Sequence, residues 1–385
     1  MTSINHLSSF DFEMMAQALR LAARGQKTCM PNPAVGCVVV KNGRVLGEGW
    51  HELAGEDHAE INALKSIGKL SHGATAYVTL EPCSYHGRTP PCVDALVVAG
   101  IARVVYGMTD PNPKVSGSGL SKLEKAGILV EGPLLELQAQ QLNRGYIKRH
   151  KCNQPWVTIK LAMSLDGRTA MGDGESKWIT GFHARQDVQR LRAKHCAIIT
   201  GIGTVLQDNP SLTVRYEEID RSDGLPNEKR DSSRELSLKQ PLRVVVDSKL
   251  NTPVDAKILS TTGSVLIAST LISDALGSSK AEIVRVPGND ERVDLSELLK
   301  ILAERECNNV LVEAGPKLAG AFLQAGLADE LVVYVAPKLL GNMARPLFHL
   351  PFIHMNQQVE LDIIDIGQVG GDLRITARPI KNSAI

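Results

Sequence analysis

Apolar positions in the N-terminal half of the chain alternate between helical and extended spacing. They recur at helical spacing over residues 11–25, and the unbroken apolar run 35–40 is typical of a buried strand. Asn42-Gly43 predicts a hairpin turn into a return strand over 44–49. Similar patterns predict helices over 58–67, 93–99, 117–127 and 134–149, and strands over 74–80 and 102–107. This mixture of strands and helices indicates an α/β domain.

The C-terminal half alternates strands and helices after a turn near residues 152–155. A mainly parallel sheet is expected, with an antiparallel addition at its end. The polar, charged stretch 217–240 is interpreted as a mobile surface loop. The predicted strands cover 156–162, 197–200, 243–247, 265–268, 282–286, 309–313, 330–336 and 373–377, and the helices cover 183–194, 295–306 and 318–325. We therefore expect two α/β domains, 1–152 and 153–385.

Composition supports this division and excludes several classes of protein. A chain of 385 residues suits two domains, and 43% hydrophobic residues are enough for two cores. The net charge of +1 gives no electrostatic support for a nucleic-acid partner. No apolar run approaches the roughly 20 residues that span a bilayer, and the N-terminus lacks a signal-peptide pattern. Seven cysteines without framework spacing suit a reducing compartment, so we expect a cytoplasmic protein.

The stretch from His58 to Cys92 carries the clearest chemistry. His58, Glu60, Cys83 and Cys92, with a proline before each cysteine, match the pattern of zinc-dependent nucleobase deaminases. One imidazole and two thiolates can hold zinc and leave a fourth position for water, whose pKa then falls to roughly 7. Glu60 would not bind zinc. It would carry the proton from that water to the ring nitrogen and the departing ammonia.

Two plainer interpretations compete with a catalytic zinc site. A single histidine is more often a surface or core residue, and Cys83 and Cys92 could be buried thiols. They could also form half of a structural zinc site, which usually closes with four protein ligands. Glu60 favours the catalytic interpretation, because a structural site has no need of a carboxylate beside an open zinc position.

Three patches in the second half indicate a further site. They cover 160–167 with 176–180 close behind, 201–215, and 312–320. The last follows a strand and opens a helix, whose backbone N–H groups can bind phosphate. The glycine spacing is not that of a Rossmann fold. The residues alone therefore support an α/β domain with a phosphate-holding turn, for which a nucleotide-cofactor reductase is one interpretation among several.

Longer motifs resemble a known family. The runs His58–Ala63, Glu81–Cys92 and Pro31–Gly36 resemble the deaminase half of bifunctional riboflavin-biosynthesis enzymes. Eight residues between the cysteines, rather than two, separate the chain from cytidine and transfer-RNA deaminases. Residues 164–167, 203–205 and 312–315 resemble the reductase half. The resemblance implies a cytidine-deaminase-like N-terminal domain and a dihydrofolate-reductase-like C-terminal domain.

The resemblance also implies chemistry and residue roles. The first reaction would remove the 2-amino group of a phosphoribosylamino-diaminopyrimidinone with Zn²⁺, and the second would reduce the ribosyl chain to ribityl with NADPH. The small-molecule partner would be a phosphorylated pyrimidine substrate. The chain would form a homo-oligomer, either a dimer or a tetramer. His58, Cys83 and Cys92 would bind zinc, with Glu60 catalytic. Cofactor positions would be Ala162, Trp178, Thr204, Asp208, Ser248, Gly315, Pro316, Lys317, Leu318, Ala319, Gly320 and Ala321. Substrate positions would be Asn32, Ser176, Arg192, Leu212, Arg215 and Glu313, with Lys160 and Asp166 as further candidates.

Two other hypotheses stay open at this point. One keeps the zinc deaminase but gives it another nucleobase, with an inactive second domain that serves dimerisation. The other is a non-catalytic protein in which zinc only stabilises the fold. The intact cofactor-like patches weigh against the first, and Glu60 weighs against the second.

Overall fold

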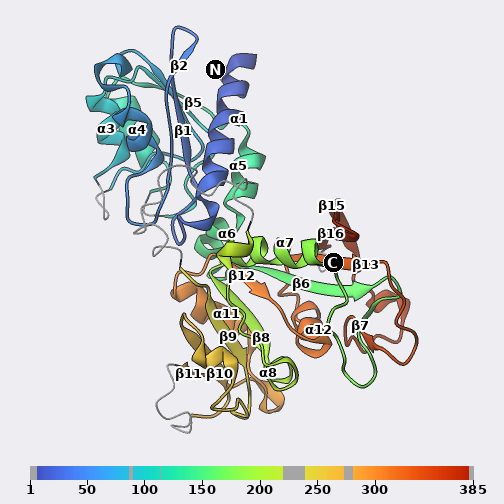
Figure 1. Ribbon diagram of the computed structural model, residues 1–385. Helices are drawn as coiled ribbons and strands as arrows, with labels where there is room; N and C mark the ends of the chain where they lie inside the picture. Colours follow the sequence, from blue (N-terminus) through green and yellow to red (C-terminus); the bar gives the residue numbers. More distant parts are fainter. Residues whose placement is uncertain (1–6, 86–89, 114, 220–238, 273–280, 381–385) are drawn as a thin grey trace. The chain divides into compact units, whose positions relative to one another are not determined.

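The computed structural model describes residues 7–85, 90–113, 115–219, 239–272 and 281–380 (Figure 1). The chain divides into two compact units, the first ending at Asn153 and the second beginning at Gln154. Each unit has its own sheet and its own hydrophobic core. Most of the polar stretch 217–240 lies outside the described residues, so its expected mobility stays a prediction.

Unit 1 is built on a mixed sheet, whose order within the described residues is β2-β1-β3-β4-β5. Asn42 and Gly43 both have positive φ, 52° and 71°, so the predicted Asn-Gly hairpin turn is confirmed. Strand β1 pairs antiparallel with β2 and β3, whereas β3, β4 and β5 run parallel. The strands are β1 (Gly36–Lys41), β2 (Arg44–Trp50), β3 (Thr75–Val78), β4 (Arg103–Tyr106) and β5 (Leu129–Glu131).

The helices of unit 1 begin largely where the sequence predicts. Ser8 caps the first one: its hydroxyl accepts from the Asp11 N–H, and the Asp11 carboxylate accepts from the Ser8 N–H. The helices are α1 (Ser9–Arg24), α2 (Ala59–Lys65), α3 (Cys92–Val98), α4 (Ser118–Lys125), α5 (Glu136–Leu142) and α6 (Arg144–Cys152), with short 3₁₀ turns η1 (Gly25–Lys27) and η2 (Gly68–Ser71).

The single helix predicted over 134–149 is wrong, because the chain breaks there into α5 and α6 at Asn143. The buried Asn143 side chain bonds both backbone groups of Ala34: Oδ1 accepts from the N–H at 2.8 Å and Nδ2 donates to the carbonyl at 2.9 Å. These tertiary bonds position the Asn32–Ala34 segment, and Asn143 leaves helical geometry to make them.

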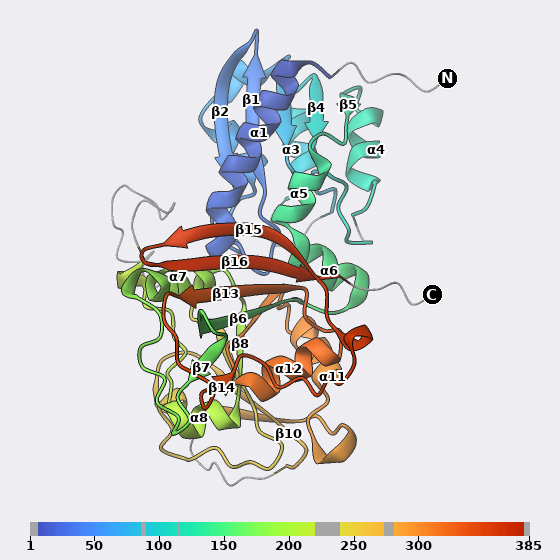
Figure 2. The same cartoon turned by 90° about the vertical axis from the view of Figure 1, so that its right-hand side faces the viewer.

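Unit 2 is built on a larger sheet, whose order over the described residues is β11-β10-β9-β8-β12-β6-β13-β16-β15. The strands from β11 to β13 are parallel, and β16 and β15 add antiparallel at one edge, as predicted. Figure 2 shows β13, β16 and β15 side by side. The strands of this sheet are β6 (Trp156–Ser164), β8 (Ala197–Gly201), β9 (Leu242–Val246), β10 (Val265–Ser269), β11 (Ala281–Arg285), β12 (Asn309–Val312), β13 (Glu330–Ala336), β15 (Leu361–Val369) and β16 (Asp372–Pro379). Strands β7 (Arg168–Ala170) and β14 (Arg345–Pro346) pair antiparallel in a separate two-stranded sheet.

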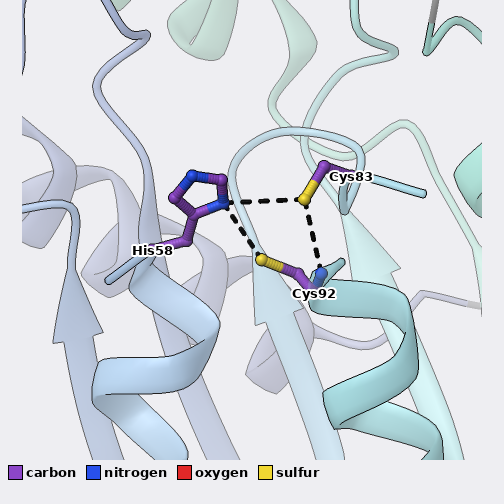
Figure 3. Close-up of side chains that lie close together, drawn as sticks. All are labelled: His58, Cys83 and Cys92. Carbon is purple, nitrogen blue, oxygen red and sulfur yellow. Dashed lines mark hydrogen bonds between the residues drawn. The ribbon is translucent and has the colours of Figure 1, made fainter. Parts of the chain in front are cut away.

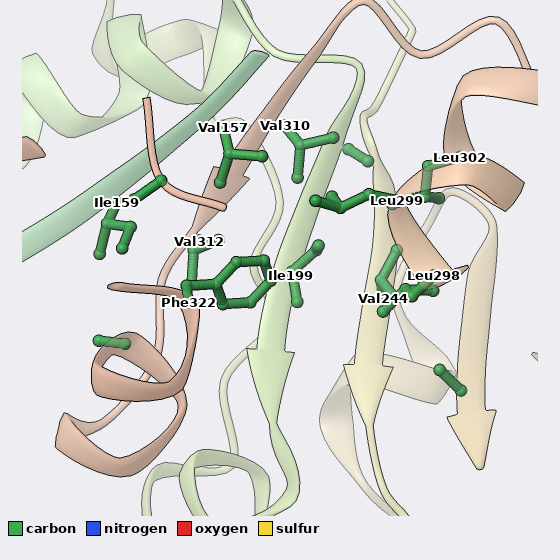
Figure 4. Close-up of a cluster of buried hydrophobic side chains, with 14 of the residues drawn as sticks. Val157, Ile159, Ile199, Val244, Leu298, Leu299, Leu302, Val310, Val312 and Phe322 are labelled. Carbon is green, nitrogen blue, oxygen red and sulfur yellow. The ribbon is translucent and has the colours of Figure 1, made fainter. Parts of the chain in front are cut away.

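Helices of unit 2 pack against this sheet, and their apolar side chains form a hydrophobic core with those of the strands. Ile199 of β8 and Val312 of β12 lie beside Phe322 of α12, and Val244 of β9 lies beside Leu298 of α11 in the same core (Figure 4). The pattern missed β7, β14 and β15; in β15 a bulge between Ile363 and Asp365 interrupts the alternation of faces. The helices are α7 (Phe182–Ala193), α8 (Ile202–Asp208), α10 (Lys257–Ser260), α11 (Leu295–Glu304) and α12 (Pro316–Gln324), with η3 (Tyr216–Glu218), η4 (Asn289–Glu291) and η5 (Met355–Gln357).

Candidate active sites

The three predicted zinc ligands of unit 1 lie together (Figure 3). His58 is the N-cap of α2, Cys92 is the first residue of α3, and Cys83 lies in the loop after β3. His58 Nδ1 is 3.1 Å from Cys92 Sγ and 3.6 Å from Cys83 Sγ, and all three donor atoms lie within 4.8 Å of one another. One imidazole and two thiols at this separation fit a zinc ion that keeps a fourth position open.

The electrostatics of the two cysteines support the same conclusion. Hydrogen bonds from the Cys92 side chain, from His58 and from the Cys92 N–H at 3.3 Å lower the pKa of Cys83 to about 4. The hydrogen bond to Cys83 and burial raise the pKa of Cys92. The pair therefore shares a proton that a dication can replace, since metal ligation deprotonates thiols.

Glu60 lies in the first turn of α2, two residues after His58, and only 3% of it is exposed. Burial raises the pKa of its carboxyl group, although the charge of His58 opposes the shift. A raised pKa favours the protonated form of a carboxyl group, which is the direction that suits a group that takes up and returns a proton.

Asn32 is connected to the ligand cluster through His51, which the sequence analysis missed. Asn32 Nδ2 is 3.0 Å from His51 Nε2, and the rings of His51 and His58 meet edge-on with centroids 5.3 Å apart. Burial lowers the pKa of His51, which favours the neutral ring. His51 Nδ1 donates to the Asp57 carbonyl, 3.0 Å away, so Nε2 accepts from Asn32. His51 directly follows β2 and belongs to no sequence motif, so the sequence offered no signal for its contact with Asn32.

The predicted reductase residues gather at the carboxyl ends of four neighbouring parallel strands, β9, β8, β12 and β6. Ligands of open α/β sheets bind at this edge. Ser248 follows β9, Thr204 opens α8 after β8, Gly315 follows β12, and Ala162 lies near the end of β6. A Cβ added at Gly315 would have Thr204 Oγ1 as its nearest neighbour, at 4.0 Å. An exposed glycine before α12, backed by a hydroxyl group, fits a cofactor phosphate.

The predicted phosphate-holding turn Gly315–Ala321 is the N-cap and the first turns of helix α12, and it is only partly available to a cofactor. Gly315 and Lys317 are exposed, whereas Ala319 and Gly320 are buried. A Cβ at Gly320 would lie 2.4 Å from the His349 carbonyl oxygen, so this glycine permits close packing beneath the turn. Gly315 and Lys317 can therefore meet a phosphate, while Ala319 and Gly320 support the turn.

Arg192 and Glu313 form the charged centre of the unit 2 site. Arg192 Nε and Nη2 donate to the two Glu313 oxygens at 2.6 and 3.0 Å, and Nη1 donates to the Thr213 carbonyl at 2.9 Å. Lys160 Nζ lies 3.9 Å from Glu313 Oε2. Burial opposes ionisation of Glu313, but the charges of Arg192 and Lys160 lower its pKa. Burial lowers the pKa of Lys160.

Four other predicted positions have different surroundings. Arg215 is paired with Glu218 through two hydrogen bonds, at 2.6 and 3.1 Å. Leu212 buries its side chain in a core cluster, so only its backbone can face a ligand. Asp208 ends α8. Trp178 is 64% exposed and stacks against Arg185, whose Cζ is 4.6 Å from the ring centroid.

Asp166 holds a loop near the end of β6. Its carboxylate accepts the N–H groups of Leu340 and Gly341 as well as the Ser164 hydroxyl. The Ser164 bond, followed by these backbone bonds, lowers the pKa of Asp166 to about 2. Asp166 therefore stabilises the loop and has no acidity suited to proton transfer at neutral pH.

Comparisons with known proteins agree with this geometry. Residues 8–108 match the cytidine and deoxycytidylate deaminase zinc-binding region, and residues 155–374 match the RibD C-terminal domain. The chain belongs to the RibD family. The riboflavin biosynthesis protein RibD of Escherichia coli (strain K12) is 48% identical over 360 residues, covering 93% of this chain and 96% of that protein. Its Haemophilus influenzae counterpart is 45% identical over 374 residues, covering 97% and 98%.

Two solved RibD-family structures have the same fold. Acinetobacter baumannii RibD, form 1, has a TM-score of 0.87 at 43% identity, covering 97% of this chain and 99% of that one. The diaminohydroxyphosphoribosylaminopyrimidine deaminase/5-amino-6-(5-phosphoribosylamino)uracil reductase of Thermotoga maritima has a TM-score of 0.82 at 31% identity, covering 96% of this chain and 99% of that one. The predicted fold class, deaminase-like and then dihydrofolate-reductase-like, is confirmed.

Family membership also decides the broad chemistry. The chain is a bifunctional enzyme of riboflavin biosynthesis, with a zinc-dependent deaminase domain and an NADPH-dependent reductase domain. This favours two catalytic domains over a deaminase with an inactive partner domain and over a non-catalytic zinc protein. Among the helices that the structure describes, none has the length and apolar character to cross a membrane.

Proposed function

We propose that the chain converts 2,5-diamino-6-(5-phosphoribosylamino)pyrimidin-4(3H)-one in two steps. Unit 1 hydrolyses the 2-amino group to a carbonyl and releases ammonia, and unit 2 then reduces the ribosyl side chain to ribityl. The observation that carries the proposal is the group His58, Cys83 and Cys92 beside the buried Glu60, in a chain of the RibD family. A reductase domain in the same chain fits this order of steps, because its proposed substrate is the product of the deamination.

In the first step, His58, Cys83 and Cys92 would hold zinc, which lowers the pKa of a water molecule to about 7. Glu60 takes one proton from the attacking water and delivers it to the ring nitrogen. It then takes the second proton from the hydroxyl group added to the ring and delivers it to the leaving amine, so that the carbonyl forms as ammonia departs. The burial of Glu60 keeps both protons away from bulk solvent. Asn32 contacts the pyrimidine, with its amide oriented by the bond from Nδ2 to His51.

In the second step, NADPH would supply a hydride to C1′ of the opened sugar. The edge formed by β9, β8, β12 and β6 orients the cofactor, and Glu313 is held near the reacting atoms by Arg192. The proposed cofactor residues are Ala162, Trp178, Thr204, Asp208, Ser248 and the turn Gly315–Ala321. The proposed substrate residues of this unit are Ser176, Arg192, Leu212, Arg215 and Glu313.

We further propose that the chain acts in the cytoplasm as a homo-oligomer and without a nucleic-acid partner. The net charge of +1 and the cysteine pattern support the compartment and the lack of a nucleic-acid partner. The sheet edge of unit 2 supports self-association. Edge strand β15 exposes Leu361, Ile363 and Ile366 by 46–58%, and Leu373 beside them on β16 is 44% exposed. Cross-strand pairing puts these residues on one face, and an exposed apolar strand edge favours pairing with another chain.

The test is an assay of the purified, zinc-loaded protein on the diaminopyrimidinone phosphate, with and without NADPH. We expect ammonia release without NADPH, and NADPH oxidation that depends on the first product. Ammonia release without later oxidation would contradict the second step. Neither signal from a protein with zinc bound would contradict the proposed substrate.

A further inference from the structure

Glu81 is a buried acid close to the metal-binding cluster, with 3% of its surface exposed. It stands two residues before Cys83 and is not among the grouped metal-ligating side chains of the described residues. Its carboxylate accepts three backbone hydrogen bonds from the segment 110–119. Oε2 accepts from the N–H of Asp110 at 3.2 Å and of Gly117 at 2.9 Å, and Oε1 accepts from Gly119 at 2.9 Å.

The start of α4 also packs closely against the loop that carries Cys83. A Cβ added at Gly119 would lie 2.0 Å from the Pro82 carbonyl oxygen, so only glycine allows this approach. The hydroxyl groups of Ser84 and Ser118 lie 2.6 Å apart. Contacts before and after Cys83 therefore join its loop to the start of α4.

Cys83 needs such support more than the other two ligands do. His58 and Cys92 stand at the starts of α2 and α3, so a helix fixes the backbone of each. Cys83 lies in a loop without regular structure, where its carbonyl accepts the Val93 N–H at 3.2 Å and its Sγ accepts the Cys92 N–H at 3.3 Å. Beyond these two bonds to the start of α3, its backbone position depends on residues 81–84 and what they contact.

We propose that Glu81 is a positioning residue of the metal centre: its carboxylate ties segment 110–119 to the Cys83 loop and so fixes that thiolate for zinc. The inference rests on the proposed ligands His58, Cys83 and Cys92. A carboxylate suits the task because all three partners are N–H donors, two of them at the start of α4, where negative charge is favoured. Glutamine at this position would turn an NH₂ group toward N–H donors and lose at least one of the bonds.

The test compares Glu81→Gln with Asp11→Asn in the full-length protein. Asp11 is the matched control: it is also a buried acid of unit 1, but it bonds Ser8, Tyr77 and Arg103. The measurements are the rate of zinc transfer to a chromophoric chelator, the visible spectrum of the Co²⁺-substituted protein, and the melting temperature. For Glu81→Gln we expect zinc loss at least ~10-fold faster, as for other residues that orient metal ligands, and an altered thiolate-to-cobalt band. For Asp11→Asn we expect a lower melting temperature with zinc transfer and the cobalt spectrum unchanged.

If Glu81→Gln lowers only the melting temperature, like the control, the positioning role is refuted. If the unmutated protein fails to bind zinc, or if Cys92→Ser leaves binding unchanged, the proposed ligand set fails instead. The two failures are therefore distinguishable.

A second measurement needs no variant and covers the case in which Glu81→Gln does not fold. Because coupling between two sites is reciprocal, removal of zinc should loosen the bonds to Glu81. We expect the amides of Gly117 and Gly119 to exchange hydrogen faster after chelation, while the amide of Asp11 keeps its rate. Equal exchange at Gly117 and Gly119 with and without zinc would contradict the proposal.

Discussion

Arg192 and Glu313 lie 121 positions apart in the sequence and are joined by two hydrogen bonds, at 2.6 and 3.0 Å. Their side chains are 11% and 9% exposed. The resemblance to the family assigns each of them separately to the substrate. The geometry adds that each holds the other, so Arg192 can meet a phosphate only with the N–H groups that Glu313 and Thr213 leave available.

Replacing Glu313 by glutamine should abolish most of the reductase activity and spare deamination. The change leaves Arg192 and Lys160 without their shared counter-charge, and a displaced active-site group can cost on the order of 100-fold in rate. Loss of one partner of a buried ion pair also costs about 3–5 kcal/mol of stability. NADPH oxidation, ammonia release and urea unfolding measure the three effects.

The control for that experiment is Glu297→Gln, which breaks the exposed Glu297–Lys300 pair on α11 of the same unit. It should leave both activities unchanged and alter stability by less than about 1 kcal/mol. Equal reductase rates for Glu313→Gln and Glu297→Gln would show that the buried pair has no part in the reaction.

Glu60→Gln should keep zinc and lose deamination by at least ~100-fold, the usual contribution of a general acid–base group. The zinc content of the protein and ammonia release are the measurements. Glu48→Gln, which alters an exposed glutamate on β2, is the control and should deaminate normally. Deamination at the normal rate by Glu60→Gln would overturn the assignment of the proton carrier.

Removal of zinc should separate the two activities. We expect a chelator to stop ammonia release, because His58, Cys83 and Cys92 then lack their ion. NADPH oxidation should continue when the deaminated product is supplied directly, because unit 2 has its own sheet and core. A parallel loss of both activities would contradict independent sites, and added Zn²⁺ should restore deamination.

Unit 1 should lose stability on acidification through Asp11. Burial opposes its ionisation, but hydrogen bonds from Arg103, Tyr77 and Ser8 lower the pKa of Asp11 below its ordinary value of 3.8. A lowered carboxyl pKa contributes stability above the ordinary value, and this contribution is lost as pH falls through the folded-state value. Asp11→Asn should therefore be less stable than the parent at pH 7, and the difference should shrink below pH 3.8. Urea unfolding across this range tests the prediction; a constant difference would disprove it.

A charge on the apolar face of β15 should break the homo-oligomer. Ile363→Lys puts an ammonium group on a strand edge whose Leu361 and Ile366 neighbours are also exposed. We expect sedimentation to report a smaller species with unfolding unchanged. The control is Val98→Lys on α3, which is 88% exposed. The proposed interface is wrong if both variants sediment like the parent.

The sequence predicted those parts of the fold that depend on local pattern. Apolar runs located β8 and β12, which are central strands of the sheet, and the Asn42-Gly43 pair located the first hairpin. The break at Asn143 escaped prediction because its cause is a pair of bonds to Ala34, 109 positions away. The bulge in β15 removed the alternation by which that strand would have been recognised.

The same division holds for the sites. The predicted zinc ligands do gather: His58 and Cys92 stand at helix starts, which local pattern predicts, and Cys83 lies in the loop after β3. The link from Asn32 to His51, the pairing of Arg192 with Glu313 and the bonds of Glu81 all join distant segments. Sequence spacing contains no information on which polar groups will meet in this way.

The position of β12 between β6 and β8, both made earlier in the chain, has a consequence for synthesis on the ribosome. Unit 1 is complete once residue 153 has emerged and can fold while the rest is still being translated. The sheet of unit 2 stays incomplete until residues 309–312 are synthesised. These residues then pair with β6 and β8, which were synthesised more than a hundred residues earlier. During that delay the facing edges of β6 and β8 lack their partner, so the nascent reductase half is where chaperone assistance matters most.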